Sequence, residues 1–138
     1  MERLLSEISE QDWAYLAGII DGEGNIRFAV RGNRKSSYET RVSIYNTDVG
    51  LINWILGKFG GSTFDHANNN HRFGHKSVHK VYWASSDDVR RILTGTQPYM
   101  IVKKRVATAL LAALQFPREE LVAWKLLHDN QKEVSRNE

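Results

Sequence analysis

The sequence predicts an α+β domain built on one curved four-stranded sheet, antiparallel or mixed, with helices packed on one face. Two observations support this class. The hydrophobic pattern passes from helical spacing to alternation and back, in the order helix, two strands, helix, two strands, helices. No linker rich in Pro, Gly or Ser divides the chain. We therefore treat residues 1–138 as a single domain, whose tail is expected to fray from about residue 131.

The first element is a helix that ends at an acidic turn flanked by glycines. Ser9, with Asp12 three residues later, is typical of a helix N-terminus. The apolar face of this helix consists of Trp13, Leu16, Ile19 and Ile20. Gly22 and Gly24 end the helix, with Glu23 between them. Because the negative end of the helix dipole disfavours a carboxylate there, Glu23 indicates that a divalent cation also binds at this turn.

A second stripe on the same helix has small side chains. It consists of Ala14, Ala17, Gly18 and Asp21. Small residues four positions apart allow two helix backbones to approach each other closely. The stripe therefore predicts that this helix packs against another helix.

Two strands, over residues 25–31 and 38–45, are predicted to follow and to be joined by a basic loop with a Gly-Asn turn. Their alternation directs one apolar set of side chains to the core: Ile26, Phe28, Val30, Val42 and Ile44. The opposite, mostly polar set faces outward: Asn25, Arg27, Ala29, Arg31, Glu39, Arg41, Ser43 and Tyr45. We therefore expect one buried and one solvated sheet face.

A helix over about residues 46–59 separates this pair from a second strand pair at 62–66 and 77–85. The later strand continues the same two faces, with Val81 and Trp83 inward and Lys80 and Tyr82 outward. Further helices are predicted over about residues 86–95, over 99–114 and from Pro117 onward.

Residues 16–24, LAGIIDGEG, resemble the signature motif of the LAGLIDADG homing endonucleases. Six of the nine motif letters are identical: Leu16, Ala17, Gly18, Ile20, Asp21 and Gly24. The other three, Ile19, Gly22 and Glu23, keep the size or the charge of the motif residue. That family has the αββαββα order predicted above, so the resemblance covers most of residues 9–127. It implies the LAGLIDADG fold and a site-specific homing endonuclease acting on double-stranded DNA.

The resemblance also implies a divalent-metal site at the end of the motif helix. Glu23 matches the metal-binding acid of the motif, and the neighbouring carbonyl of Gly22 matches a second ligand. Phosphodiester hydrolysis needs an activated water and neutralised charge, which divalent metals supply. Mg²⁺ suits such oxygen ligands. Two or more ions are expected per dimer, with Mn²⁺ as a substitute.

A single motif implies a homodimer, because each chain brings one acid and cleavage of two strands needs two sites. By the resemblance, the motif helices of two copies pack side by side through Ala14, Ala17, Gly18 and Asp21. Asp21 then has a structural role at the helix end and the partner interface. The implied target is long and partly palindromic.

Accessory catalytic residues follow from the same resemblance. Lys103 matches the family's lysine that organises the attacking water or polarises the phosphate, and Lys104 is the second choice. Asn46 ends the second strand, where a polar residue often orders the water network. Asn46 is also well suited to cap the helix that follows.

One departure from the family concerns a basic residue on the helical turn after the second strand. Gly50 and Leu51 occupy that region here, so this residue is missing. Either Arg41 or Lys80 replaces it, or the activity is weak.

The net charge of +3 is unevenly distributed along the chain. Residues 1–24 carry a net −5, residues 25–82 a net +6 and residues 83–138 a net +2. The positive excess lies in the predicted strands, which indicates a polyanionic partner. Such a sheet face can follow a DNA major groove, where Arg reads guanine and loop Lys binds phosphate. The predicted DNA contacts are Arg27, Arg31, Arg34, Lys35, Arg41, Tyr45, Lys80 and Tyr82.

A non-cleaving intron RNA maturase or DNA-binding regulator with the same fold is the open alternative, because a basic sheet can hold RNA as well. A zinc site formed by His71, His75 and His79 is disfavoured, since Gly74 and the Asn-rich approach predict a hairpin rather than a helix. An HNH nuclease motif is excluded because the Asp, His and Asn residues around 65–71 are too closely spaced for its ββα unit.

Composition excludes several other classes. The chain has no cysteine, which excludes disulfides, thiolate zinc sites and cysteine nucleophiles. It has no apolar run long enough to span a bilayer, and its acidic start does not resemble a signal peptide. We therefore expect an intracellular protein with no membrane partner.

Overall fold

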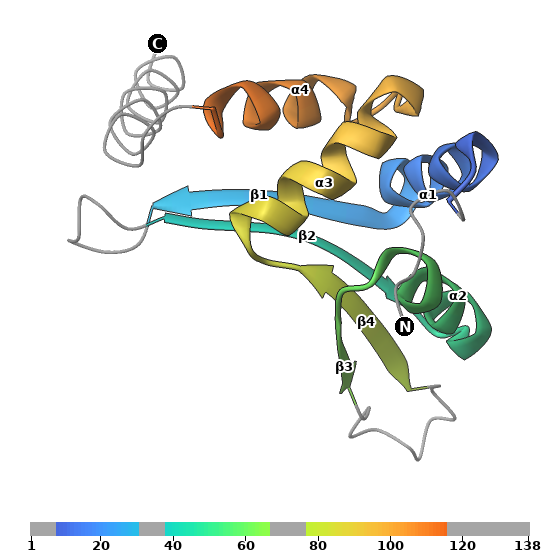
Figure 1. The fold of residues 1–138 in the computed structure, drawn as a ribbon. Coiled ribbons are helices and arrows are strands. Elements are labelled where there is room, and N and C mark those ends of the chain that lie inside the picture. The colour runs from blue at the N-terminus through green and yellow to red at the C-terminus, as the bar shows by residue number, and fades with distance from the viewer. Residues whose placement is uncertain (1–7, 31–37, 67–76, 116–138) are drawn as a thin grey trace, which may run out of the picture.

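The computed structural model describes residues 8–30, 38–66 and 77–115 (Figure 1). In chain order the elements are α1 (Glu10–Glu23), β1 (Gly24–Val30), β2 (Tyr38–Asn46), α2 (Val49–Phe59), β3 (Ser62–His66), β4 (Val78–Trp83), α3 (Ser86–Thr96), the 3₁₀ turn η3 (Gln97–Tyr99) and α4 (Lys104–Ala113). Three predicted features lie outside the described residues: the helix from Pro117, the fraying of the tail and the tip of the second hairpin. None of the helices within these ranges combines the length and apolarity needed to cross a membrane.

All four strands pair antiparallel, in the order β1-β2-β4-β3. Each hairpin contributes one central strand, and these two strands pair with each other. In that pairing Val42 lies opposite Trp83 and Ile44 opposite Val81. Figure 1 shows β1 and β2 running across the molecule and β3 and β4 turned downward, so the sheet is strongly twisted. The predicted α+β class is confirmed, and the sheet is antiparallel rather than mixed.

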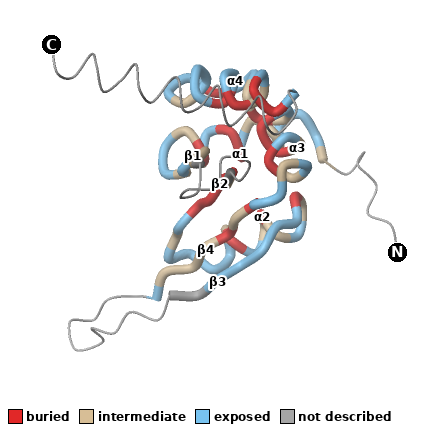
Figure 2. Tube along the Cα trace, turned by 90° about the vertical axis from the view of Figure 1, so that its left-hand side faces the viewer, coloured by how far each residue is buried: buried red, intermediate tan, exposed pale blue. Residues whose placement is uncertain are grey.

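The core lies between one face of this sheet and the helices. Val42, Ile44, Val81 and Trp83 are at most 1% exposed, as their predicted inward direction requires. The helices contribute mainly Leu16, Ile20, Ile52, Ile55, Phe59, Val89, Ile92 and Leu93. Figure 2 shows the buried stretches of the helices and of the central strands gathered in the interior. Burial of such side chains is the main stabilising contribution to a domain of this size.

Side chains cap three of the helices. Ser9 and Asp12 form a capping box at α1, with hydrogen bonds of 3.0 and 3.1 Å. The side chain that caps α2 is Asp48 rather than Asn46. Ser85 caps α3. Asn46, the last residue of β2, does not provide the side-chain cap of α2, so its amide NH₂ group is available for another contact.

The turn between α2 and β3 depends on two glycines. Gly60 and Gly61 have positive φ angles of 73° and 107°, which other residues rarely adopt. A Cβ atom on Gly61 would lie 2.9 Å from Nε1 of Trp83. The turn therefore passes directly over the largest core side chain, and only glycine fits there.

The helix predicted over residues 99–114 is wrong at its beginning. The chain forms the short η3 turn first, and α4 starts only at Lys104. Residues 100–103 between them are not helical. Their N–H groups face the carboxylate of Asp21, which accepts hydrogen bonds from three of them. A tertiary contact thus overrides the local helical pattern.

Candidate active site

The carboxylate of Glu23 is exposed at the last residue of α1, where the chain passes directly into β1. Nδ2 of Asn46, the last residue of β2, donates a 2.8 Å hydrogen bond to Oε1 of Glu23. The antiparallel register brings these two ends together, since Gly24 pairs with Ile44. Oδ1 of Asn46 accepts a 2.7 Å hydrogen bond from the N–H of Asp48, which caps α2. The Glu23 carboxylate is therefore oriented by a side chain that is itself fixed.

Asp21, two residues before Glu23, points toward the start of α4. Its Oδ2 accepts hydrogen bonds from the N–H groups of Ile101 and Val102 at 2.7 and 3.0 Å, and its Oδ1 accepts one from the N–H of Lys103 at 2.8 Å. Partial burial by itself raises the pKa of this carboxyl, but the three N–H donors and the charge of Lys103 outweigh it and leave the pKa below its ordinary value. Asp21 is therefore a charged group that ties residues 101–103 to the end of α1, and its role at a partner interface stays a prediction.

Lys103 is half-buried at the N-terminal end of α4, and its Nζ donates a 2.7 Å hydrogen bond to the main-chain oxygen of Asp21. Lys104, the second choice from the sequence, is exposed on the next position. The structure thus brings Asn46 and Lys103 to the same end of α1. One contacts the carboxylate of Glu23, and the other contacts the main chain of Asp21.

The donor set at this end of α1 consists of oxygen atoms. In the described part of the chain, no three His, Asp or Glu side chains come close enough together to hold a metal ion. One carboxylate, a main-chain carbonyl and waters suit Mg²⁺, which keeps several of its waters. If a metal ion bound here, the described residues of a single chain would supply only part of its coordination shell.

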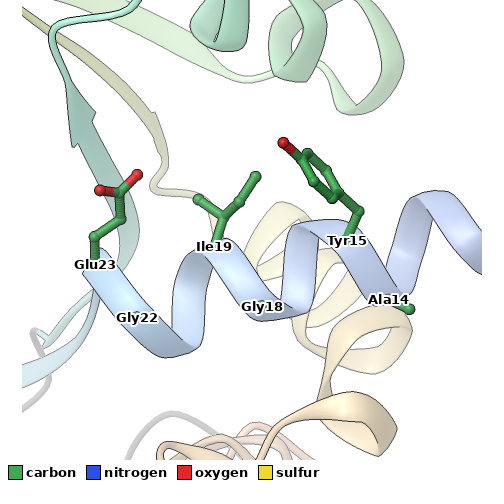
Figure 3. Close-up of a pocket in the computed structure, with 6 residues that line it drawn as sticks. All are labelled: Ala14, Tyr15, Gly18, Ile19, Gly22 and Glu23. Atoms are coloured by element: carbon green, nitrogen blue, oxygen red, sulfur yellow. The ribbon is translucent and has the colours of Figure 1, made fainter.

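One side of α1 lines an open hollow of about 570 Å³ (Figure 3). Its lining residues are Ala14, Tyr15, Gly18, Ile19, Gly22 and Glu23. Figure 3 shows Tyr15, Ile19 and Glu23 projecting from the same side of the helix. Tyr15 is 57% exposed although its ring stacks edge-on against Trp54. A helix side with exposed apolar groups around glycines is suited to contact another surface.

The predicted small-residue stripe needs one correction. Ala17 is fully buried in the core of its own chain, so it does not lie on the exposed side of α1. Asp21 uses its carboxylate to bind residues 101–103. Ala14 and Gly18 lie on the exposed side, and Gly22 continues their line. Small size alone could not distinguish the side of the helix that faces the core.

Four glycines in the described part of the chain differ in the space around them. A Cβ on Gly24 would lie 2.7 Å from the Cα of Ile20, and a Cβ on Gly95 would lie 2.3 Å from the ring of Trp13. Gly18 and Gly22, in contrast, have open space around the Cβ position and no positive φ angle. Glycine within a helix costs roughly 0.5–1 kcal/mol relative to alanine. Nothing in the described part of this chain requires that cost at either position.

The outer face of the sheet, which points away from the helices, combines cations with aromatic rings. Cζ of Arg41 lies 5.0 Å from the ring centre of Tyr82, and Nζ of Lys80 lies 5.0 Å from the same centre. Nζ of Lys80 also lies 5.2 Å from the ring centre of Tyr45. These cation–π contacts tie together four of the predicted DNA-contacting side chains across β2 and β4. Of the other four predicted contacts, Arg27 lies on β1, and Arg31, Arg34 and Lys35 lie outside the described residues.

An acid, Glu39, lies between two arginines of this face. Arg27 and Arg41 are directly opposite each other in the β1–β2 pairing, where like charges repel. Oε1 of Glu39 lies 3.7 Å from a guanidinium nitrogen of each. The buried Nε of Arg41 has no hydrogen-bond partner in the described part of the protein. The Arg41 guanidinium is thus held between Glu39 and the ring of Tyr82.

Comparison with solved structures identifies the fold as that of the LAGLIDADG homing endonucleases. The homing endonuclease I-CvuI in complex with its target matches with a TM-score of 0.61 and 17% sequence identity, over 77% of this chain and 67% of that one. The archaeal intron-encoded I-Vdi141I complexed with DNA matches with a TM-score of 0.61 and 17% identity, over 77% and 68% of the two chains. The predicted fold family is confirmed.

A lysine-to-alanine variant of I-SmaMI also matches, with a TM-score of 0.61 and 24% identity. The match covers 79% of this chain and 39% of the I-SmaMI chain. No protein-family model matches the sequence, and no curated protein matches it closely enough to count as a relative. At these identities the similarity concerns the fold alone.

Sequence reasoning missed the contact between Asp21 and residues 101–103. These residues are about 80 positions apart, and nothing in either segment marks them as partners. It also missed Glu39 as an acid that pairs with two predicted DNA-contacting arginines. Strand alternation already places Glu39 on the same face as Arg41, which was the available signal, but the pairing itself was not predicted.

Proposed function

We propose that this protein is a site-specific homing endonuclease, which as a homodimer cuts both strands of a long, partly palindromic DNA target with the help of a divalent metal. The observation that carries the proposal is the exposed Glu23 carboxylate, held at the end of α1 by a 2.8 Å hydrogen bond from Asn46. A carboxylate at a helix C-terminus is electrostatically unfavourable. Its fixed orientation there is explained if it binds a cation.

The proposed metal ligands are the carboxylate of Glu23 and the main-chain oxygen of Gly22. Both residues are exposed, and Asn46 uses only one lone pair of the Glu23 carboxylate. Mg²⁺, or Mn²⁺ in its place, would supply an activated water and neutralise charge at the phosphate. Asn46 orients the carboxylate, and Lys103 holds a positive charge beside the same helix end.

The proposed dimer packs the exposed sides of two α1 helices against each other. Gly18 and Gly22 have free space around them that another helix backbone would fill, and Ala14 continues this surface. The packing would bring two copies of Glu23 toward one two-fold axis. Two acids near one axis complete the site that one chain provides only in part.

The proposed DNA-binding surface is the outer face of the sheet. Arg27, Arg41 and Lys80 supply its positive charge, and Tyr45 and Tyr82 hold the cations in place. Arg on a twisted sheet can form paired hydrogen bonds with guanine in the major groove. The solved complexes of similar fold that contain DNA support this partner.

The test is cleavage of a library of long, partly palindromic duplexes in Mg²⁺, with Ca²⁺ as a binding-only condition. We expect double-strand breaks at one related set of sites, which Glu23→Gln abolishes while binding survives. Glu10→Gln is the matched control, because Glu10 lies at the other end of α1 and is also hydrogen-bonded, to Tyr99 at 2.8 Å. Cleavage that persists in Glu23→Gln, or that needs no divalent metal, would contradict the proposal.

A second candidate function is supported by exposed aromatic side chains. Phe64 is 53% and Tyr45 is 42% exposed, and both lie on the outer face beside Lys80. Exposed rings on a basic sheet are suited to stack on unpaired RNA bases. A non-cleaving intron RNA maturase or DNA-binding regulator would bind selectively with no cutting in any divalent metal. The absence of cutting separates this candidate from the endonuclease, and competition between folded RNA and duplex DNA for the wild-type protein separates the maturase from the regulator.

A further inference from the structure

We propose that Asp21 is the positioning residue for Lys103, because it holds both the main chain and the ammonium group of that lysine beside the Gly22–Glu23 turn. This inference rests on the proposed function, in which Lys103 acts on the phosphate or the attacking water. It gives Asp21 a role in the rate of the reaction in addition to its structural one.

Two hydrogen bonds, both donated by Lys103, join the two residues. The N–H of Lys103 donates to Oδ1 of Asp21 at 2.8 Å, and Nζ of Lys103 donates to the main-chain oxygen of Asp21 at 2.7 Å. The Lys side chain is a flexible four-carbon stem that normally samples many rotamers. Here its base and its tip are both bound to the same residue. The ammonium group is thereby confined to one place.

The charges around this contact are unfavourable for an ordinary helix start. Lys103, Lys104 and Arg105 crowd the positive N-terminal end of α4. Lys103 is the N-cap residue, yet no side chain caps this helix locally. Ser, Asp or Asn would be stabilising there, and Lys is not. The Asp21 carboxylate compensates from a distant part of the chain, through three successive N–H groups.

An unfavourable charge also lies at the C-terminal end of α1, where it is negative rather than positive. Glu23 lies at the negative end of its helix, and Lys103 lies at the positive end of α4. Asp21 joins these two helix ends. We infer that the two unfavourable charges are retained together because the site needs both, and that Asp21 keeps them at a fixed separation.

The first experiment compares the chemical reactivity of two neighbouring lysines. Reductive methylation of the folded protein, followed by mass spectrometry, gives the rates for Lys103 and for the exposed Lys104. In the wild-type protein we expect Lys103 to react several-fold more slowly. In Asp21→Asn we expect the Lys103 rate to rise several-fold while the Lys104 rate is unchanged. Equal methylation rates for Lys103 and Lys104 in the wild-type protein would overturn the proposal. This comparison does not depend on the folding of any variant.

Asp12→Asn is the matched control for that experiment. Asp12 is the other aspartate of α1; it also accepts a backbone hydrogen bond and pairs with a lysine, Lys58 at 3.0 Å. The same substitution there removes a structural carboxylate without touching the Lys103 segment. If Asp12→Asn also changes the rate for Lys103, the effect is general loosening and the proposal fails.

The second experiment is a double-mutant cycle on the single-turnover cleavage rate. We expect Asp21→Asn and Lys103→Met each to slow cleavage by about 10²-fold at unchanged DNA affinity. The double variant should be no slower than Lys103→Met, because Asp21 acts through that lysine. If the double variant is instead slowed by the product of the two single-variant losses, the proposal is overturned. If the wild-type protein does not cleave DNA, the proposed function fails, and the reactivity ratio still decides whether Asp21 positions Lys103.

Discussion

The side-chain amide of Asn46 donates a 2.8 Å hydrogen bond to Oε1 of Glu23 and so joins the end of β2 to the end of α1. The other side of the same amide accepts from the N–H of Asp48, at the start of α2. Three elements therefore meet at one carboxylate. Its orientation depends on the whole β1–β2 pairing and not on α1 alone.

Asn46→Asp should separate the two contacts of this side chain. The aspartate can still accept from Asp48, but it cannot donate to Glu23 and places a second negative charge against it. We expect the cleavage rate to fall by about 10- to 100-fold, as is usual for groups that orient a metal ligand. Duplex affinity in Ca²⁺ should remain within a factor of about two to three. Asn53→Asp, at an exposed position of α2, should leave the rate unchanged.

Gly18→Leu should produce a folded monomer. The open space around Gly18 accepts a side chain within its own chain. Glycine disfavours a helix by about 0.8–1 kcal/mol relative to alanine, and leucine ranks next to alanine. Between two packed α1 helices the same side chain would force the backbones apart. We expect the dimer dissociation constant to rise at least about 100-fold in sedimentation velocity, or ~2.7 kcal/mol. Gly57→Leu, at an equally open position of α2, should remain dimeric. A wild-type protein that is monomeric with and without DNA would contradict the proposed dimer.

Glu39→Gln should weaken discrimination between DNA sequences. The substitution removes the acid that lies 3.7 Å from both Arg27 and Arg41, and so frees two cations for phosphate groups. We expect affinity for random duplex DNA to rise by about 3- to 10-fold and its salt dependence to steepen by about 0.9 for each added phosphate contact. Asp87→Asn, which breaks a 3.0 Å ion pair with Arg90 on α3, should change neither quantity. An unchanged salt slope in Glu39→Gln would show that the two arginines do not contact DNA.

The pH dependence of stability should include a contribution from Asp12. A backbone hydrogen bond from Ser9 and the side chain of Lys58 lower the pKa of this carboxyl below its ordinary value. A lowered pKa means that the folded state favours the charged form, so the stabilisation is present above the unfolded-state pKa of about 3.9 and is lost as pH falls through the folded-state value. We expect the stability difference between wild type and Asp12→Asn to be constant near neutral pH and to vanish in acid. Urea unfolding at a series of pH values measures this difference. A stability difference that persists at the lowest pH would contradict the contribution assigned to the Asp12 carboxylate.

Local patterns predicted most of the fold. Alternation gave the correct inward side chains in β2 and β4, and the capping signal of Ser9 with Asp12 is confirmed. Alternation and capping depend on residues close in sequence, where steric and hydrogen-bonding preferences act directly. The LAGIIDGEG segment predicted the fold family because it fixes how α1 meets the sheet.

Contacts between distant segments were beyond such reasoning. The interrupted helix at residues 100–103 follows from Asp21, and local hydrophobic spacing could not reveal it. Ala17 has the same small side chain as Ala14, and only the packed structure shows that it faces the core. Asn46 was predicted as a candidate, but its bond to Glu23 depends on strand register.

The opposed charges at the ends of α1 and α4 have a consequence for evolution and engineering. Neutralising Glu23, or replacing Lys103 with a conventional capping residue, would relieve an unfavourable helix-end charge and raise the melting temperature. A selection for heat resistance alone would therefore favour the loss of the residues proposed for chemistry. In a selection for thermostable variants, each generation should therefore be screened for cleavage activity. At Glu23 and Lys103, the residue that favours thermal stability differs from the residue that the proposed reaction needs.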